Sequence, residues 1–150
     1  MRLLNLITCS RAPRSVLLIR LLVGAVFLSE GIQKFLYPVE VGAGRFEQIG
    51  LPSPELLASL VGGFEICCGV LVLLGLLTRV ATLPLLAIMC VAIATTKIPI
   101  LHESGFWKMT HASRTDFSML LGSLFLLIVG AGPWSLDAWI GPGKQATQMR

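Results

Sequence analysis

Residues 16–36 read VLLIRLLVGAVFLSEGIQKFL, an apolar run that is long enough to cross a lipid bilayer as one α-helix. About 20 predominantly apolar residues span the hydrocarbon layer of a membrane. Basic residues precede the run, as in a signal peptide, but the run is longer than an h-region and no A-x-A cleavage site follows it. The sequence therefore predicts a transmembrane helix that is retained in the protein.

Three more apolar runs follow, at about Glu55–Leu77, Val80–Leu101 and Thr115–Gly132. The chain has 150 residues, of which 55% are hydrophobic and 13% are charged. A soluble domain carries about 25% charged residues, so this composition leaves too little polar surface for a water-soluble fold. We predict an all-α fold, a four-helix transmembrane bundle that forms a single domain over residues 1–150.

The segments between these runs differ in kind. Residues 37–54 are rich in proline and glycine, which forbids a continuous helix, although a short turn around Arg45 and Phe46 fits the pattern. Thr78 and Arg79 alone separate the second run from the third, so these two spans form an antiparallel hairpin.

Residues 102–114 are the most polar connection and are predicted to form a loop between the third and fourth spans. Phe106 and Trp107 in this loop are suited to the headgroup region of a membrane.

An even number of spans places both termini on one side of the membrane, and the distribution of basic residues predicts which side. Cytoplasmic segments carry an excess of lysine and arginine. Seven of the 12 basic residues fall on the side of the termini, which we therefore predict to be cytoplasmic. These seven are Arg2, Arg11, Arg14, Arg20, Arg79, Lys144 and Arg150.

Several classes of site do not fit the sequence. The net charge of +4 is spread over the ends of the apolar runs, unlike a nucleic-acid-binding stripe. His102 and His111 lie in one connection, so no pair of histidines within the spans is available for a haem, and we predict no metal site. The four cysteines form no C-x-x-C motif that would indicate zinc or redox chemistry; they are Cys9, Cys67, Cys68 and Cys90.

Glycines recur on single faces of the first two spans. Gly24 and Gly31 share a helical stripe with Arg20 and Lys34, and Gly62 and Gly69 share one with Glu65. Small residues let neighbouring transmembrane helices approach closely. The residues predicted to lie at helix contacts are Gly24, Gly31, Gly62 and Gly69.

Ionisable residues inside the spans are the most informative feature of the sequence. A charge at the bilayer centre costs about 2.5 to 3.5 kcal/mol on the insertion scale, so it needs a compensating partner. Glu65 falls near the midplane, and other polar residues fall in the half of the membrane opposite the termini. We predict a polar chamber there that serves as a substrate, quinone or proton site. Its residues are Glu30, Gln33, Lys34, Glu65, Thr96, Lys97, His111 and Asp116.

A purely structural interpretation of these residues stays open. Lys34 and Lys97 can snorkel towards the headgroups. Glu30 can pair with Lys34 one helical turn further on. Glu65 would then be a neutral, hydrogen-bonded side chain.

Taken in order, the motifs of the chain resemble those of the DoxX family of small bacterial membrane proteins. The first is Arg20-x3-Gly24-x2-Phe27-x3-Gly31-x2-Lys34, and it is followed by Gly50-Leu51-Pro52, Glu65-x3-Gly69 and Gly75-x2-Thr78-Arg79. The last is Gly130-x-Gly132-Pro133-Trp134-Ser135-Leu136-Asp137. The resemblance runs from about Leu17 to Trp139.

The resemblance implies a four-helix multi-pass protein of the bacterial inner membrane. Some family members are subunits of thiosulfate:quinone oxidoreductase, and others associate with superoxide- and thiol-handling enzymes or with catechol and quinone detoxification. The thiosulfate enzyme's subunits form a related but distinct branch, so thiosulfate is not carried over to this chain.

Three functions follow as hypotheses. The first is a subunit of a redox-linked complex, which binds a quinone or a small reduced substrate in the polar chamber. This subunit is oxidoreductase-associated and has no intrinsic cofactor or electron-transfer centre, so a partner redox protein in or on the membrane supplies one. The second is a non-catalytic assembly protein that docks a partner through glycine-lined helices. The third is a small transporter that uses Glu65 as a proton carrier.

Overall fold

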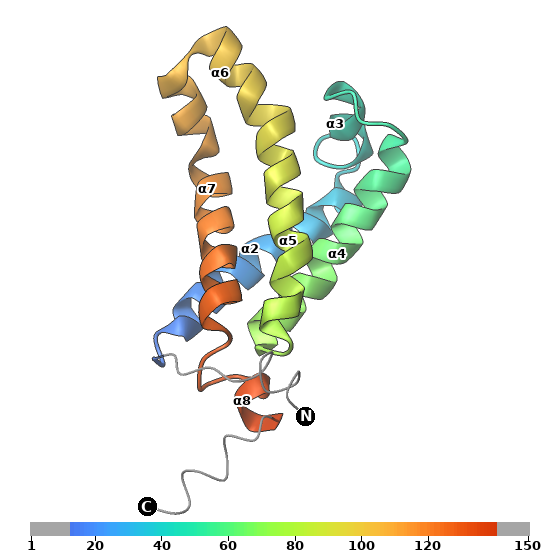
Figure 1. The fold of residues 1–150 in the computed structure, drawn as a ribbon. Helices are drawn as coiled ribbons and strands as arrows, with labels where there is room; N and C mark the ends of the chain where they lie inside the picture. The colour runs from blue at the N-terminus through green and yellow to red at the C-terminus, as the bar shows by residue number, and fades with distance from the viewer. Residues whose placement is uncertain (1–12, 141–150) are drawn as a thin grey trace, which may run out of the picture.

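The chain folds into four long helices and two short ones in the part that the computed structural model describes, residues 13–140 (Figure 1). The long helices are α2 (Val16–Leu36), α4 (Pro54–Leu74), a 27-residue helix (Thr78–Ser104) and α7 (Phe106–Val129). All four are long and apolar enough to cross a membrane. No strand occurs between residues 13 and 140, so the predicted all-α, four-span fold is confirmed.

Some predictions fall outside the described residues. Four of the basic residues used to predict the orientation lie there, namely Arg2, Arg11, Lys144 and Arg150. Cys9, one of the four cysteines considered for metal or redox chemistry, lies there as well. The cytoplasmic placement of the termini therefore stays a prediction.

The third span is not a uniform α-helix. It consists of α5 (Thr78–Ala92), the π-helical turn η1 (Ile93–Lys97) and α6 (Ile98–Ser104). Pro99 follows the π-turn, and a proline ring clashes with the carbonyl group four residues earlier in a regular α-helix. The wider hydrogen-bonding pattern of a π-turn relieves that clash one turn ahead of the proline.

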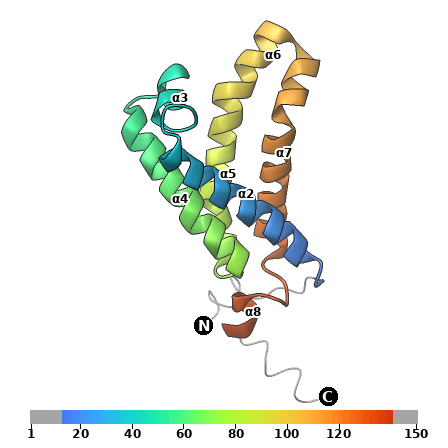
Figure 2. The ribbon, with the colours of Figure 1, turned by 180° about the vertical axis from the view of Figure 1, so that it is seen from behind.

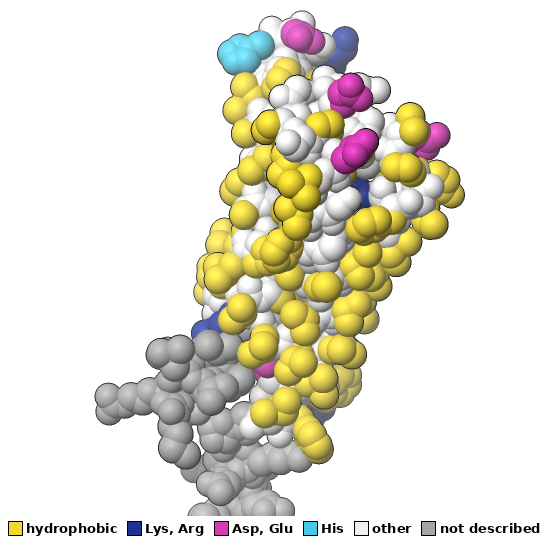
Figure 3. All heavy atoms as spheres, turned by 90° about the vertical axis from the view of Figure 1, so that its right-hand side faces the viewer, with side chains coloured by type: hydrophobic (Ala, Val, Ile, Leu, Met, Phe, Trp, Pro, Cys, Tyr) yellow, Lys and Arg dark blue, Asp and Glu magenta, His cyan; other side chains and the backbone are white. Residues whose placement is uncertain are grey.

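The helices form two antiparallel pairs, α2 with α4 and the third span with α7. The pairs meet at the end of the bundle that carries α8 (Leu136–Ile140), and they diverge towards the end that carries α3 (Ala43–Gln48) and α6 (Figures 1 and 2). We call these the α8 end and the α6 end. Hydrophobic side chains cover the flank between the two ends, as expected for a surface in contact with lipid (Figure 3).

Two predicted connections differ from the structure. The loop expected over residues 102–114 is wrong, because only Gly105, with a φ of 83°, separates α6 from α7. Hydropathy falls at the membrane boundary, whereas a helix can continue beyond it. The fourth helix accordingly starts nine residues before the predicted Thr115. The hairpin between the second and third spans turns at Gly75–Leu77 rather than at Thr78 and Arg79.

The other boundaries agree more closely. The first helix is Val16–Leu36, as predicted, and the short turn around Arg45 and Phe46 is present as α3.

Glycines bring the backbones of α2 and α4 into direct contact. A Cβ atom on Gly31 would lie 2.8 Å from the carbonyl oxygen of Gly62, and one on Gly24 would lie 2.9 Å from that of Gly69. In return, a Cβ on Gly69 would lie 3.0 Å from the carbonyl oxygen of Gly24. All four glycines of the sequence stripes therefore lie at one helix–helix contact, where no side chain fits between the backbones.

Arg20 ties three segments together at the α8 end. Its side chain is 2% exposed, and its Nε and Nη2 atoms donate to the carbonyl oxygens of Val72 (2.9 Å) and Leu73 (2.6 Å) in the last turn of α4. Its Nη1 atom donates to the carbonyl oxygens of Ala131 (3.2 Å) and Trp134 (2.5 Å) in the segment after α7. A cation at a helix C-terminus satisfies carbonyl groups that have no partner within the helix. We call this arrangement the arginine clamp.

Asp137 completes the same end of the bundle. Its carboxylate oxygens accept hydrogen bonds from the backbone N–H groups of Leu77 (2.7 Å) and Thr78 (3.1 Å), at the start of α5. Its own N–H group donates to the carbonyl oxygen of Gly75 at 2.9 Å. A carboxylate in this position caps the helix and interacts favourably with its dipole. The first residues of α8 therefore fix the start of α5, which has no cap from its own side chains.

Candidate functional site

Lys34 and Glu65 form an ion pair within the membrane-spanning part of the bundle. The Nζ atom of Lys34 lies 2.6 Å from Oε2 of Glu65, and the two side chains are 10% and 3% exposed. Lys34 lies in the last turn of α2 and Glu65 in the middle of α4. Because the two helices approach closely at Gly31 and Gly62, one turn away from each of these residues, the lysine can reach across to the glutamate.

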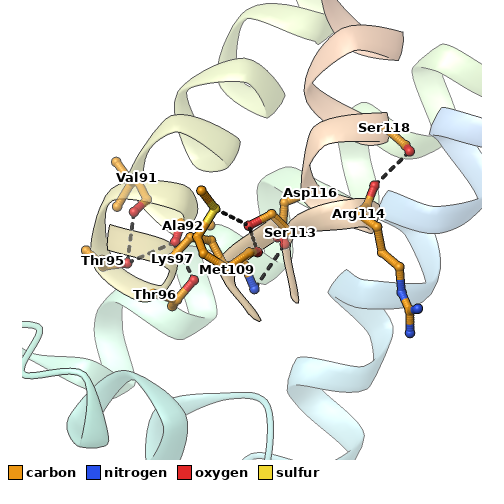
Figure 4. Close-up of polar contacts among 10 residues, drawn as sticks. All are labelled: Val91, Ala92, Thr95, Thr96, Lys97, Met109, Ser113, Arg114, Asp116 and Ser118. Carbon is orange, nitrogen blue, oxygen red and sulfur yellow. Dashed lines mark hydrogen bonds and ion pairs between the residues drawn. The ribbon is translucent and has the colours of Figure 1, made fainter. Parts of the chain in front are cut away.

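A second ion pair links the other two helices. The Nζ atom of Lys97, the last residue of η1, lies 3.0 Å from Oδ2 of Asp116 in α7, with side chains 11% and 22% exposed (Figure 4). Figure 4 shows both side chains directed at each other across the gap between the two helices, while the side chain of Arg114 points away. This pair is more accessible than the Lys34–Glu65 pair.

Two threonine side chains of the π-turn that ends at Lys97 bond to the backbone. The hydroxyl groups of Thr95 and Thr96 donate to backbone carbonyl oxygens of the preceding turn, Val91 at 2.8 Å and Ala92 at 2.6 Å (Figure 4). These bonds satisfy carbonyl groups in the region where the regular helical pattern changes. π-turns are rare and occur frequently at functional sites, which adds weight to Lys97 as a candidate.

Three more residues predicted for the chamber take part in neither ion pair. Gln33 donates to the hydroxyl oxygen of Ser29 on its own helix, at 2.9 Å. His111 is exposed on α7, five residues before Asp116 and hence on a different face of the helix. Glu30 is exposed on α2.

The structure thus brings four of the eight predicted residues together, as two separate pairs. In the alternative interpretation Glu30 was the partner of Lys34, but Lys34 pairs with Glu65 across the helix contact. Between residues 13 and 140, no group of three or more His, Cys, Asp or Glu side chains is placed to hold a metal ion.

The sequence did not indicate the roles of Arg20 and Asp137. Arg20 was counted as a basic residue and placed on the glycine stripe of the first span without a partner, and Asp137 was named only as part of a closing motif. Both are 2% exposed, and both bond to segments that are distant along the chain. One signal could have indicated the role of Arg20. An arginine on the glycine stripe of a membrane helix is costly, so it needs acceptors from other segments.

Comparison with known proteins identifies the family. The model of the DoxX family matches residues 15–98, more than half of the chain. The chain belongs to the DoxX family. The matched region of this DoxX protein includes α2, α4 and most of the third span, and it contains Lys34, Glu65 and Lys97.

Two relatives cover nearly the whole DoxX chain. An uncharacterized membrane protein of Mycobacterium tuberculosis, Rv3486, is 59% identical over 144 residues, which are 92% of this chain and 87% of the relative. A protein of Bacillus subtilis named "Putative oxidoreductase CatD" is 31% identical over 131 residues, which are 86% of this chain and 89% of the relative. No solved structure matches the chain significantly.

Proposed function

We propose that this DoxX protein is an inner-membrane subunit of a redox-linked complex, in which it holds either a quinone or a small reduced substrate at the Lys34–Glu65 pair. The observation that carries the proposal is the burial of this pair inside a membrane-spanning bundle. Burying two charges costs several kcal/mol per ion before their attraction is counted, so a buried pair is weak evidence of a stabilising role. Intramembrane ionisable residues typically mark substrate, ion or proton pathways.

The chemistry of the pair suits a quinone. The ammonium group of Lys34 has three N–H donors, and Glu65 occupies one direction at 2.6 Å. A second donor is then available for a quinone carbonyl oxygen, while Glu65 orients the lysine and offers a carboxylate that can hold a proton. When bound, the quinone supplies two-electron redox chemistry in the bilayer. The residues of the chain would bind it and exchange protons with it.

A partner protein would supply the electron-transfer group. The family relative named as an oxidoreductase supports a redox setting for this fold.

The hypothesis of a non-catalytic assembly protein assigned the docking of a partner to the glycine-lined helix faces. Gly24, Gly31, Gly62 and Gly69 all lie inside the contact between α2 and α4, so these glycine-lined faces are not free to dock a partner.

Mild purification followed by mass spectrometry of the bound quinones and other small molecules tests the proposal. We expect a quinone or a small reduced compound to co-purify with the wild-type protein in near-stoichiometric amount, and to be lost at least tenfold in Lys34→Met and Glu65→Gln. Lys108→Met, which removes an exposed lysine at the start of α7, is the matched control and should retain the ligand. Retention of the ligand by both pair variants, or its absence from the wild-type protein, would refute the proposal.

A further inference from the structure

Glu30 lies on the same face of α2 as residues that pack on α7, but at a position where α7 no longer contacts α2. Near the α8 end, α2 packs on α7, because a Cβ atom on Gly122 would lie 2.6 Å from the side chain of Val23 and 3.9 Å from that of Ile19. Glu30 follows Val23 by seven residues, or about two helical turns, and so lies on the same stripe. Val23 is completely buried, whereas Glu30 is exposed, because the two helix pairs diverge towards the α6 end (Figures 1 and 2).

Glu30 forms no ion pair within the described part of the chain, and its charge adds to that of Glu65 nearby. The two ion pairs there are Lys34–Glu65 and Lys97–Asp116, and neither includes Glu30. Exposed Ser29 and half-buried Gln33, which hydrogen-bond to each other, lie beside it on the helix. We call Ser29, Glu30 and Gln33 the polar face of α2.

This polar face does not suit contact with lipid or with the same face of another copy. Glu30 precedes the end of α2 at Leu36 by six residues, or about 9 Å along the helix axis, so its short side chain lies within the membrane-spanning segment. A carboxylate facing hydrocarbon there is costly. A second copy docked symmetrically through this face would bring Glu30 against Glu30, and like charges at close distance repel.

We infer that the polar face of α2 is the docking surface for a transmembrane helix of a partner protein that carries a lysine or arginine at the depth of Glu30. The cation would neutralise the carboxylate, and the side-chain amide of Gln33 would add a hydrogen bond between the helices. The divergence of α2 from α7 gives the helix access to this face. The inference takes one premise from the proposed function, which is that the protein has a partner in the membrane.

The test uses synthetic transmembrane peptides as probes for the full-length protein in phosphatidylcholine vesicles. One peptide is a leucine–alanine helix of bilayer-spanning length with a single lysine six residues from one end, and its matched control has leucine at that position. Energy transfer from a donor on the protein to an acceptor on the peptide measures association. We expect the lysine peptide to bind the wild-type protein about tenfold more tightly than Glu30→Gln, and the leucine peptide to bind both proteins equally weakly.

Several outcomes would overturn the inference. Equal binding of the lysine peptide to wild type and Glu30→Gln would do so, as would an equal loss in Glu40→Gln, which removes an exposed carboxylate outside the spans. Self-association of the wild-type protein that Glu30→Gln abolishes would assign the face to a second copy instead.

The thermal stability of the variant tests whether Glu30 holds the bundle itself. Glu30→Gln should melt within about 2 °C of wild type, because substitutions at exposed positions usually change stability little. A fall in melting temperature of more than about 5 °C would overturn the inference, because it would show that Glu30 holds the bundle together. No quinone is read out in these measurements, so their failure would leave the proposed ligand site untouched.

Discussion

The two ends of the bundle use buried charge in opposite ways. At the α8 end, Arg20 and Asp137 bond to backbone groups of other segments, so their charges serve to close the fold. At the α6 end, Lys34 and Lys97 bond to carboxylate side chains, so the charges satisfy each other and could be replaced together. From this difference we expect the first end to contribute more to stability, whereas the proposed function places ligand binding at the second end.

Removal of the arginine clamp should have the largest effect on stability. Arg20→Met removes the guanidinium donor from the carbonyl groups of Leu73, Ala131 and Trp134, at about 1 to 3 kcal/mol for each buried group, while Val72 keeps its bond from the N–H of Gly75. We expect a total loss of at least about 3 kcal/mol, measured by unfolding in detergent micelles. Arg45→Met, in the short helix α3, is the control and should be near neutral. A clamp variant as stable as this control would contradict the assigned role of the α8 end.

A bulky side chain in the contact between α2 and α4 should have the second-largest effect on stability. Gly31→Leu forces a side chain against backbone atoms of α4 that would lie 2.8 to 2.9 Å from its Cβ. Overpacking of this kind costs typically 1 to 3 kcal/mol, and we expect about 3 kcal/mol because the contacting atoms are backbone. Gly63→Leu, where a Cβ atom meets nothing within 4 Å, is the matched control. If both variants melt at the same temperature, the tight contact between α2 and α4 is not needed for stability.

The Lys34–Glu65 pair should behave as a replaceable unit. Lys34→Met alone leaves a buried carboxylate and should cost about 3 kcal/mol, whereas Lys34→Met with Glu65→Leu should recover most of that loss. A double-mutant cycle on thermal stability measures the coupling. Recovery of stability together with loss of the bound ligand would separate a functional pair from a structural one. A double variant less stable than either single variant would place this pair with the closing interactions of the α8 end.

Loss of the carboxylate cap should have a smaller effect. Asp137→Ala removes the acceptor for the N–H groups of Leu77 and Thr78, and a lost helix cap costs about 1 to 2 kcal/mol. The melting temperature in detergent checks this, and Asp137→Asn should keep part of the stability. An unchanged melting temperature for Asp137→Ala would show that α5 starts without this cap.

The smallest effect should follow from breaking the more accessible pair at the α6 end. Asp116→Asn should cost about 1 kcal/mol or less, since the pair is partly exposed and such pairs contribute little. The cost should shrink further at high salt, because solvent-exposed charges are screened. A loss of several kcal/mol in stability that does not depend on salt would show that the Lys97–Asp116 pair contributes as much to the fold as the arginine clamp.

The sequence predicted the helices and their contact faces well, but not the partners of the charges. Apolar runs defined four spans, and the spacing of Gly24, Gly31 and Lys34 defined one face of α2. Helical periodicity states which residues share a face, but it does not state which residue of another helix lies opposite. Lys34 was therefore given either a local partner, Glu30, or a general chamber, whereas its partner Glu65 is 31 positions away.

The connections show a second limit of the same kind. Hydropathy detects where a helix leaves the hydrocarbon layer, and residues 106–114 are polar enough to fall below that level while remaining helical. A single residue, Gly105, makes the turn, and such a short connection carries little signal in a window of some 20 residues.

The arginine clamp also has a consequence for the order in which the protein is made. The first helix contributes Arg20, but two of its acceptors belong to Ala131 and Trp134, more than one hundred residues later. While the chain is being synthesised, the first helix therefore precedes all four acceptors of Arg20, and the two in α4 become available before the two after α7. Its partners are complete when the last helix has been inserted and the segment after it has left the ribosome. The arginine clamp is therefore completed only by the segment after α7, and a nascent chain that stops before Gly130 lacks two of its four acceptors.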